Sequence, residues 1–216
     1  MTTQITSFKD IQNRLIAVDT EYQVLQNAPA LSRIERETTI HKVWCASFSH
    51  NEKAFSIWTG NDDFMPDILD RAAKHFDVLN PIFVNYAYFA EWEAFSRLGV
   101  DMFAYDWVDV HLLYRILSNS YTDKVETTLV SMCKDILGVS IDSAHKDAMR
   151  ELCISGNVEG NEAQIMNYCE EDTRHLIPAL FNLEDRLNRR LALDVTMPVN
   201  CRHRGDRSTP VASLIM

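Results

Sequence analysis

The sequence predicts an α/β fold, a sheet flanked by helices, and the order of its segments is the main evidence for this. Three β-rich segments follow one another near the N-terminus, strands then alternate with helical segments, and the last part is helical. The length of 216 residues, with 46% hydrophobic residues, suits one domain with a sizeable core. No internal repeat or low-complexity block divides the chain.

The elements of the N-terminal half follow from short apolar runs rich in β-branched and aromatic residues, and from one segment with apolar residues at helical spacing. Ser7 or Asp10 can cap the first turn, and Asp62 or Asp63 can cap the helix. The expected elements are a turn in residues 1–13, a strand over 15–18, a polar loop over 27–42, strands over 43–49 and 53–59 joined as a hairpin, and a helix over 62–76.

In the C-terminal half, short β-rich apolar runs alternate with segments that have apolar residues at helical spacing, and the last part is helical. Gly99 and Gly138 are expected to end helices, and Pro178 to kink one. The expected elements are strands over 81–89 and 107–110, helices over 91–98, 111–117, 127–137, 142–152 and 161–191, a polar break over 118–126 and a loop over 155–160. Residues 1–196 are predicted to form the domain, and residues 197–216 a tail or linker.

The composition restricts the class of protein. The formal net charge of -10 excludes a general nucleic-acid coating protein but is compatible with an enzyme that binds a few nucleotides and gathers carboxylates around metal ions. Five widely spaced cysteines without a CxxC pair indicate reduced thiols rather than a zinc knuckle or a disulfide framework. No run approaches the roughly 18 apolar residues of a membrane span, and the start lacks signal-peptide features, so a cytoplasmic protein without membrane contact is expected.

Two carboxylates end the first apolar strand. Asp19 and Glu21 follow the run from Leu15 to Val18 and are two residues apart. Because side chains alternate along a strand, both carboxylates are expected to project from the same face, close enough to share a cation. A solvated strand end is the alternative for any single Asp-x-Glu, and the downstream residues decide against it.

Two later segments carry side chains that fit the same site. Tyr168 and Asp172 lie four apart on the last predicted helix and therefore share a face. Glu91 follows the strand predicted over 81–89 and begins a helix, so its carboxylate can lie at the same sheet edge as Asp19. For Tyr168 and Asp172 alone, a solvated helix face is the commoner explanation.

Taken in this order, the motifs resemble the DEDD superfamily of 3'-5' exonucleases, in the DEDDy subgroup with a tyrosine before the last aspartate, over roughly residues 14–190. Asp19 and Glu21 match the first motif, and Tyr168 and Asp172 match the third. The segment Trp107–Asp109 and the helix after it are similar to stand-alone and phage or viral polymerase-associated members. The resemblance implies a ribonuclease-H-like mixed sheet with helices on both sides.

The second motif departs from the family pattern. An ungapped match puts Asn85 on the family's histidine and Ala90 on its aspartate, whereas a one-residue shift puts Glu91 there. We favour Glu91, because Phe95 and Gly99 then occupy the positions of the family's helix. If Ala90 holds the position, the chain is expected to be an inactive nucleic-acid-binding relative.

The resemblance implies phosphodiester hydrolysis with two Mg²⁺ or Mn²⁺ ions held by Asp19, Glu21, Glu91 and Asp172, which are oxygen ligands only. Tyr168 is expected to orient the attacking water rather than to act as a base, because an unperturbed tyrosine has a pKa near 10. The residues expected to contact the substrate are Thr20, Tyr22, Asn85, Tyr88 and Lys146.

The leading functional prediction is a 3'-5' exonuclease acting on the 3' end of single-stranded DNA, stand-alone or as the proofreading part of a DNA polymerase. The alternative within enzymes is trimming of RNA 3' ends, as in proteins resembling RNase D.

Overall fold

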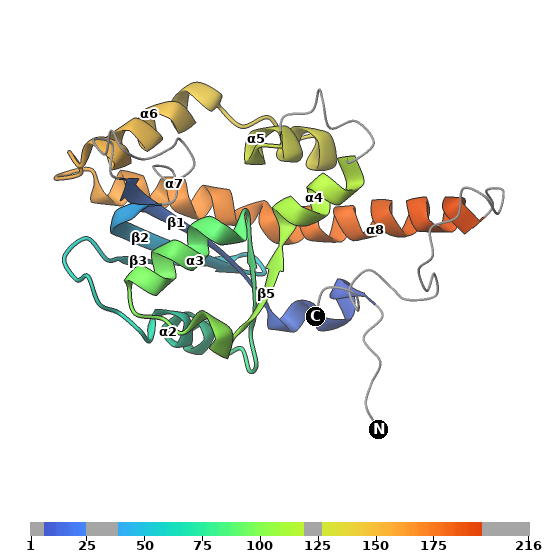
Figure 1. Ribbon diagram of the computed structural model, residues 1–216, viewed down its shortest axis with the longest axis horizontal. Helices are drawn as coiled ribbons and strands as arrows, with labels where there is room; N and C mark the ends of the chain where they lie inside the picture. Colours follow the sequence, from blue (N-terminus) through green and yellow to red (C-terminus); the bar gives the residue numbers. More distant parts are fainter. Residues whose placement is uncertain (1–6, 25–38, 119–126, 196–216) are drawn as a thin grey trace.

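The computed structural model describes residues 7–24, 39–118 and 127–195. Within these ranges, five strands form one mixed sheet in the order β3-β2-β1-β4-β5 (Figure 1). The strands are β1 (Leu15–Val24), β2 (Ile40–His50), β3 (Lys53–Trp58), β4 (Ile82–Asn85) and β5 (Asp106–Asp109). β2 is antiparallel to both β1 and β3, whereas β1, β4 and β5 are parallel. β1 therefore lies in the middle, between an antiparallel and a parallel neighbour.

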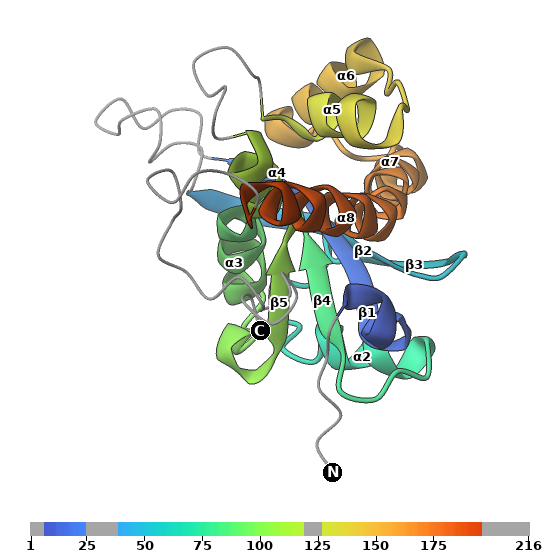
Figure 2. The ribbon, with the colours of Figure 1, turned by 90° about the vertical axis from the view of Figure 1, so that its right-hand side faces the viewer.

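Helices cover both faces of this sheet, as the sequence predicts. α2 and α3 pack on one face, α7 and α8 pack on the other, and α5 and α6 lie beyond α7 and α8 (Figures 1 and 2). The helices are α2 (Ile68–His75), α3 (Tyr88–Arg97), α4 (Val110–Ser118), α5 (Leu129–Met132), α6 (Ser143–Ser155), α7 (Glu162–Arg174) and α8 (Leu176–Val195). Short turns add η1 (Phe8–Arg14), η2 (Met102–Ala104) and the π-helical η4 (Cys133–Leu137). The predicted α/β fold class is confirmed.

The central strand β1 is buried on both faces. Leu15 and Ala17 join a core with α4, α5 and α8, while Ile16 and Val18 join a second core with α2 and α3. All four side chains are fully buried, so the apolar run fixes β1 firmly between the two helical layers.

Several local signals act as the sequence predicts. Ser7 and Asp10 form a capping box at the start of η1, and Asp142 caps α6 through the amides of Ala144 and His145. β2 and β3 form the expected hairpin, with Asn51 in the left-handed region at its turn.

The helix predicted over 62–76 begins later than expected, at Ile68. Pro66 explains this difference, because a proline disfavours helical backbone in the residue before it. Phe64, which lies within the predicted helix, precedes α2 and is 66% exposed.

The strand predicted over 81–89 is shorter, and the helix after it begins earlier. β4 ends at Asn85 and α3 begins at Tyr88, after Ala87 in the left-handed region. The Asp109 carboxylate at the end of β5 accepts hydrogen bonds from the amides of Ala87 (3.3 Å) and Tyr88 (3.1 Å). This carboxylate fixes the turn that ends the strand before its apolar run is finished.

The long helix predicted over 161–191 is two helices, which break at His175 rather than at Pro178. Pro178 has no N–H to donate, and its ring would clash with the carbonyl four residues earlier, that of Arg174. The break therefore falls before the proline, which lies in the first turn of α8, where a missing N–H costs little. The helix predicted over 127–137 is likewise divided, into α5 and η4.

Some sequence predictions lie outside the described residues: most of the loop over 27–42, residues 119–126, and the tail from residue 197. The division into a domain and a tail stays a prediction. Among the described helices, none is both long and apolar enough to span a membrane.

Candidate active site

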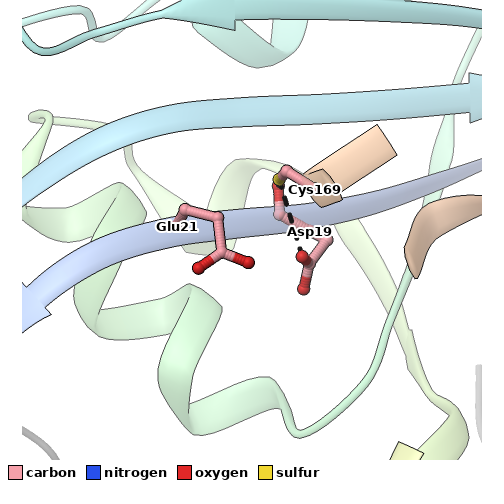
Figure 3. Close-up of side chains that lie close together, drawn as sticks. All are labelled: Asp19, Glu21 and Cys169. Atoms are coloured by element: carbon pink, nitrogen blue, oxygen red, sulfur yellow. Dashed lines mark hydrogen bonds between the residues drawn. The ribbon is translucent and has the colours of Figure 1, made fainter. Parts of the chain in front are cut away.

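β1 presents Asp19 and Glu21 on one side, just beyond the point where its pairing with β4 ends, with Cys169 of α7 beside them (Figure 3). Carboxylate oxygens of both residues and the thiol of Cys169 on α7 lie within 4.8 Å of one another. Thr20 and Tyr22 alternate with them: the Thr20 side chain is buried, and Tyr22 packs against the core under α2 and α3. The contact of Thr20 with a substrate stays a prediction.

Glu91 reaches the same place from the first turn of α3. Its side chain is only 2% exposed, and its Oε2 accepts a hydrogen bond of 3.1 Å from Asn85 Nδ2. The charge of Asp19 contributes to raising the pKa of Glu91, after burial itself, so the two carboxylates are neighbours. Asn85, predicted to contact substrate, is fully buried and orients Glu91 instead.

α7 contributes Tyr168 and Asp172, one turn apart and both buried. The two side chains are close enough for Asp172 to contribute to raising the pKa of the Tyr168 hydroxyl, after burial and the charge of Glu21. These residues face the sheet because Ile165, Cys169 and Thr173 form the buried stripe with which α7 packs on β1 and β2.

Lys146 on α6 supplies a positive charge to the carboxylates. Its ammonium forms an ion pair with Asp172 and lies 5.3 Å from the centre of the Tyr168 ring. Burial lowers the pKa of Lys146, but the charge of Asp172 and then those of Asp19 and Glu21 outweigh this, and its pKa is raised. Lys146 was predicted as a substrate contact, and here it neutralises part of the carboxylate cluster.

The carboxylates themselves are difficult to ionise. Burial, followed by the charge of Asp172, raises the pKa of Asp19 to about 7. Burial, followed by the charge of Asp19, also raises the pKa values of Glu21 and Glu91. Such shifts arise where negative charges gather without enough positive charge, and they mark functional-site candidates.

The donor set fits divalent cations. The four carboxylates carry four negative charges when ionised; they are Asp19, Glu21, Glu91 and Asp172. Lys146 supplies one positive charge, so three negative charges remain uncompensated. Two divalent cations would offset this excess, and carboxylate oxygens are the ligands that Mg²⁺ and Mn²⁺ prefer.

Two groups of functional side chains were missed by sequence analysis. The thiols of Cys169 and Cys153 contact Asp19 and Glu21, and Asp109 fixes the start of α3. Asp109 directly follows the apolar end of β5, which was an available signal; the cysteines carried none, because their neighbours are distant in sequence. Tyr88, predicted as a substrate contact, is half-buried against Trp92 and Trp107.

Comparison with known proteins places the fold. No family model and no curated protein matches the sequence. The EXO domain of Nibbler from Aedes aegypti has 16% identity and a TM-score of 0.51, with 84% of this chain and 85% of that chain covered. RNase D of Trypanosoma brucei in complex with RNA U12 has 17% identity and a TM-score of 0.53, with 86% of this chain and 64% of that chain covered. A second structure of that RNase D has 14% identity and a TM-score of 0.50, with 83% of this chain and 60% of that chain covered.

At these identities the likeness shows the fold, and the predicted ribonuclease-H-like architecture is confirmed at that level. This chain spans less than two thirds of the RNase D chains.

The charge of Asp19 should make the metal-free protein less stable as the pH rises. A carboxyl whose folded pKa is above its unfolded value binds protons more tightly in the folded state, so stability is lost between about pH 4, the unfolded value, and about pH 7. Asp19→Asn removes this loss. In EDTA, the Tm advantage of Asp19→Asn over wild type should grow across that range to at least about 3 °C. Asp185→Asn, at an exposed carboxylate, should show no such growth; an advantage independent of pH would contradict the assignment.

Replacing Lys146 should destabilise the metal-free protein. Lys146→Met keeps the length of the side chain but leaves the buried Asp172 without its cation, so we expect a loss of about 1–3 kcal/mol in the free energy of unfolding, measured in urea with EDTA. Lys9→Met is the matched control, because the Lys9–Asp185 pair is exposed and should contribute at most about 1 kcal/mol. Equal effects of the two substitutions would be inconsistent with a buried pair.

Proposed function

We propose that this protein is a metal-dependent 3'-5' exonuclease. The observation that carries the proposal is the convergence of Asp19, Glu21, Glu91 and Asp172, with Tyr168, beside β1 where its pairing with β4 ends. These residues come from three elements, β1, α3 and α7, and they match the exonuclease motifs noted in the sequence. The likeness of fold to the Nibbler EXO domain and to RNase D supports the same proposal.

The metal-binding roles are those that the resemblance implies. Asp19 would be shared by two cations; Glu21 and Asp172 would complete one shell, and Glu91 would support the other. The mutual influence of Asp19, Asp172 and Glu91 on their pKa values is compatible with these roles. When bound, two Mg²⁺ or Mn²⁺ ions supply an activated water molecule and stabilise the leaving oxygen of the phosphodiester.

Tyr168 would position the attacking water. Burial, and then the charges of Glu21 and Asp172, raise the pKa of its hydroxyl above the ordinary value, so the phenol stays protonated at neutral pH. It therefore donates or accepts a hydrogen bond and does not take up a proton as a base.

Space for a substrate lies beside these residues. A cavity of about 300 Å³ borders Tyr168 and Asp172 and is also lined by His145, Arg174 and His175. This volume lies at the lower end of the range for small-molecule sites, about 300–1,000 Å³, and suits one terminal nucleotide rather than a duplex. We infer from the resemblance that the substrate is the 3' end of a single strand, and a pocket of this size is compatible with that.

Two classes of strand are candidates. Single-stranded DNA, with a proofreading role beside a DNA polymerase, is the candidate that the sequence favours. RNA is the second candidate, and the shared fold with an RNase D solved with RNA U12 favours it. An assay with labelled single strands of both kinds, in Mg²⁺ and in Mn²⁺, decides between them.

Asp19→Ala should abolish release of mononucleotides from the 3' end while the protein stays folded, because the carboxylate shared by both cations is lost. Tyr168→Phe should lower turnover by on the order of 10²-fold and leave oligonucleotide affinity nearly unchanged, since only the hydroxyl is removed. Retained turnover in Asp19→Ala would refute the proposal. A parallel fall of affinity and turnover in Tyr168→Phe would make Tyr168 a substrate-binding residue.

The register of the second motif has its own test. Glu91→Gln should weaken binding of a second Mn²⁺ and reduce turnover, because an amide lacks the charge that a hard cation requires. Ala90→Asp should add little, since Ala90 is on the adjacent, half-exposed part of α3. The opposite result, a silent Glu91→Gln with activity gained in Ala90→Asp, would favour the ungapped register and an inactive natural protein.

A further inference from the structure

Three buried thiols lie close to the Asp19 and Glu21 carboxylates of β1. Cys45 on β2, Cys153 on α6 and Cys169 on α7 are each at most 1% exposed and belong to one small core. The proposed hydrolysis uses none of them. Cys45 pairs with Glu21 across the sheet, next to a β-bulge at Trp44. The Trp44 indole donates to the carbonyl of Cys153 (2.8 Å), which holds α6 against this core.

Two of the thiols lie beside the carboxylates. Cys169 Sγ lies 3.3 Å from the carbonyl oxygen of Asp19 and 3.5 Å from its Oδ2 (Figure 3), and Cys153 lies close enough to Glu21 to influence its pKa. Cys45 belongs to the same small core as Cys169. Sulfur and oxygen ligand atoms therefore already converge on one point, where Asp19, Glu21 and Cys169 meet within 4.8 Å.

This spacing matches a tetrahedral shell of mixed ligands. With Zn–S near 2.3 Å and Zn–O near 2.1 Å, a tetrahedral angle places the two ligand atoms about 3.6 Å apart. The Cys169 Sγ to Asp19 Oδ2 distance of 3.5 Å already has this length. A hard cation such as Mg²⁺ gains little from a sulfur ligand, whereas Zn²⁺ and Cd²⁺ bind thiolate strongly.

We propose that Asp19, Glu21 and Cys169 form a binding site for a soft divalent cation, Zn²⁺ in nature and Cd²⁺ as its probe, with the Cys169 thiolate as a direct ligand. On binding, the metal–sulfur bond forms as the S–H bond breaks, and the proton leaves to solvent. The Lys146 ammonium is paired with Asp172, which is not one of the three ligands of this site.

The site shares Asp19 with the proposed hydrolytic centre, so a soft cation would exclude Mg²⁺ or Mn²⁺ from it. Zinc would then inhibit the nuclease at concentrations that leave the fold intact. This consequence rests on the proposed function; the binding site itself does not.

Cd²⁺ titration of the metal-free full-length chain tests the site through the ultraviolet charge-transfer absorption of a cadmium–thiolate bond. A Cys201→Ser background removes the thiol of the tail region from the signal. We expect the absorption to saturate at one equivalent, to vanish in Cys169→Ser, and to persist in Cys133→Ser. Cys133 is a matched control because it is equally buried but packs in the core of α4, α5 and α8.

The affinities add a second criterion. Cys169→Ser should weaken Cd²⁺ binding by at least about tenfold while Mn²⁺ binding, measured by calorimetry, is unchanged, because a hard cation uses only the oxygens. Absence of the absorption in wild type, its persistence in Cys169→Ser, or an equal loss of both cations would overturn the proposal.

If Cys169→Ser does not fold, a cadmium NMR spectrum of the unsubstituted protein tests the proposed site. A cadmium chemical shift typical of a ligand shell that contains sulfur supports the proposal, and a shift typical of oxygen ligands alone refutes it. None of these measurements needs nuclease activity, so a failure of the proposed function would leave them unaffected.

Discussion

The burial of several carboxylates around the end of one strand is the constraint on which the rest of the structure depends. Ionised carboxylates lose hydration when they are buried, and they repel one another. The protein offsets this with one donor from each neighbouring element, and these donors are Asn85 on β4, Lys146 on α6 and Cys169 on α7. Three separate elements are therefore held in place partly by the same cluster of negative charge, and the raised pKa values show that the compensation is incomplete.

The sheet topology creates the space in which this cluster forms. β1 pairs with β4 only over Leu15–Ala17, whereas its pairing with β2 continues to Val24. Beyond Ala17, one edge of β1 has no strand beside it in the described structure, and the start of α3 enters there with Glu91. β1 is also the strand between the antiparallel and the parallel half of the sheet. The strand order also reverses at β1, because β2 and β3 lie on one side of it and β4 and β5 on the other. Ligand sites of open α/β sheets typically lie at such a reversal of strand order, beyond the carboxyl ends of the strands.

The sequence predicts those parts of this arrangement that depend on local periodicity. The two-residue spacing of Asp19 and Glu21 and the four-residue spacing of Tyr168 and Asp172 each define a face of one element, and both pairs lie as expected. The Lys146–Asp172 pair and the thiol contacts join residues 26 and 150 positions apart. No local pattern encodes such contacts, because they arise only when α6 and α7 pack against β1.

The second motif shows why an ungapped alignment could not decide the position of its carboxylate. Each residue along an α-helix turns by about 100°, so a shift of one residue moves a side chain from the buried to the exposed face. Asp109 fixes the phase of α3 through the amides of Ala87 and Tyr88, and Ala94 and Phe95 then face the core. With this phase, the side chain buried beside Asn85 is that of Glu91. The position of Glu91 therefore depends on the carboxylate of Asp109, 18 residues further along the chain. This dependence arises only in the folded protein, where β5 pairs with β4.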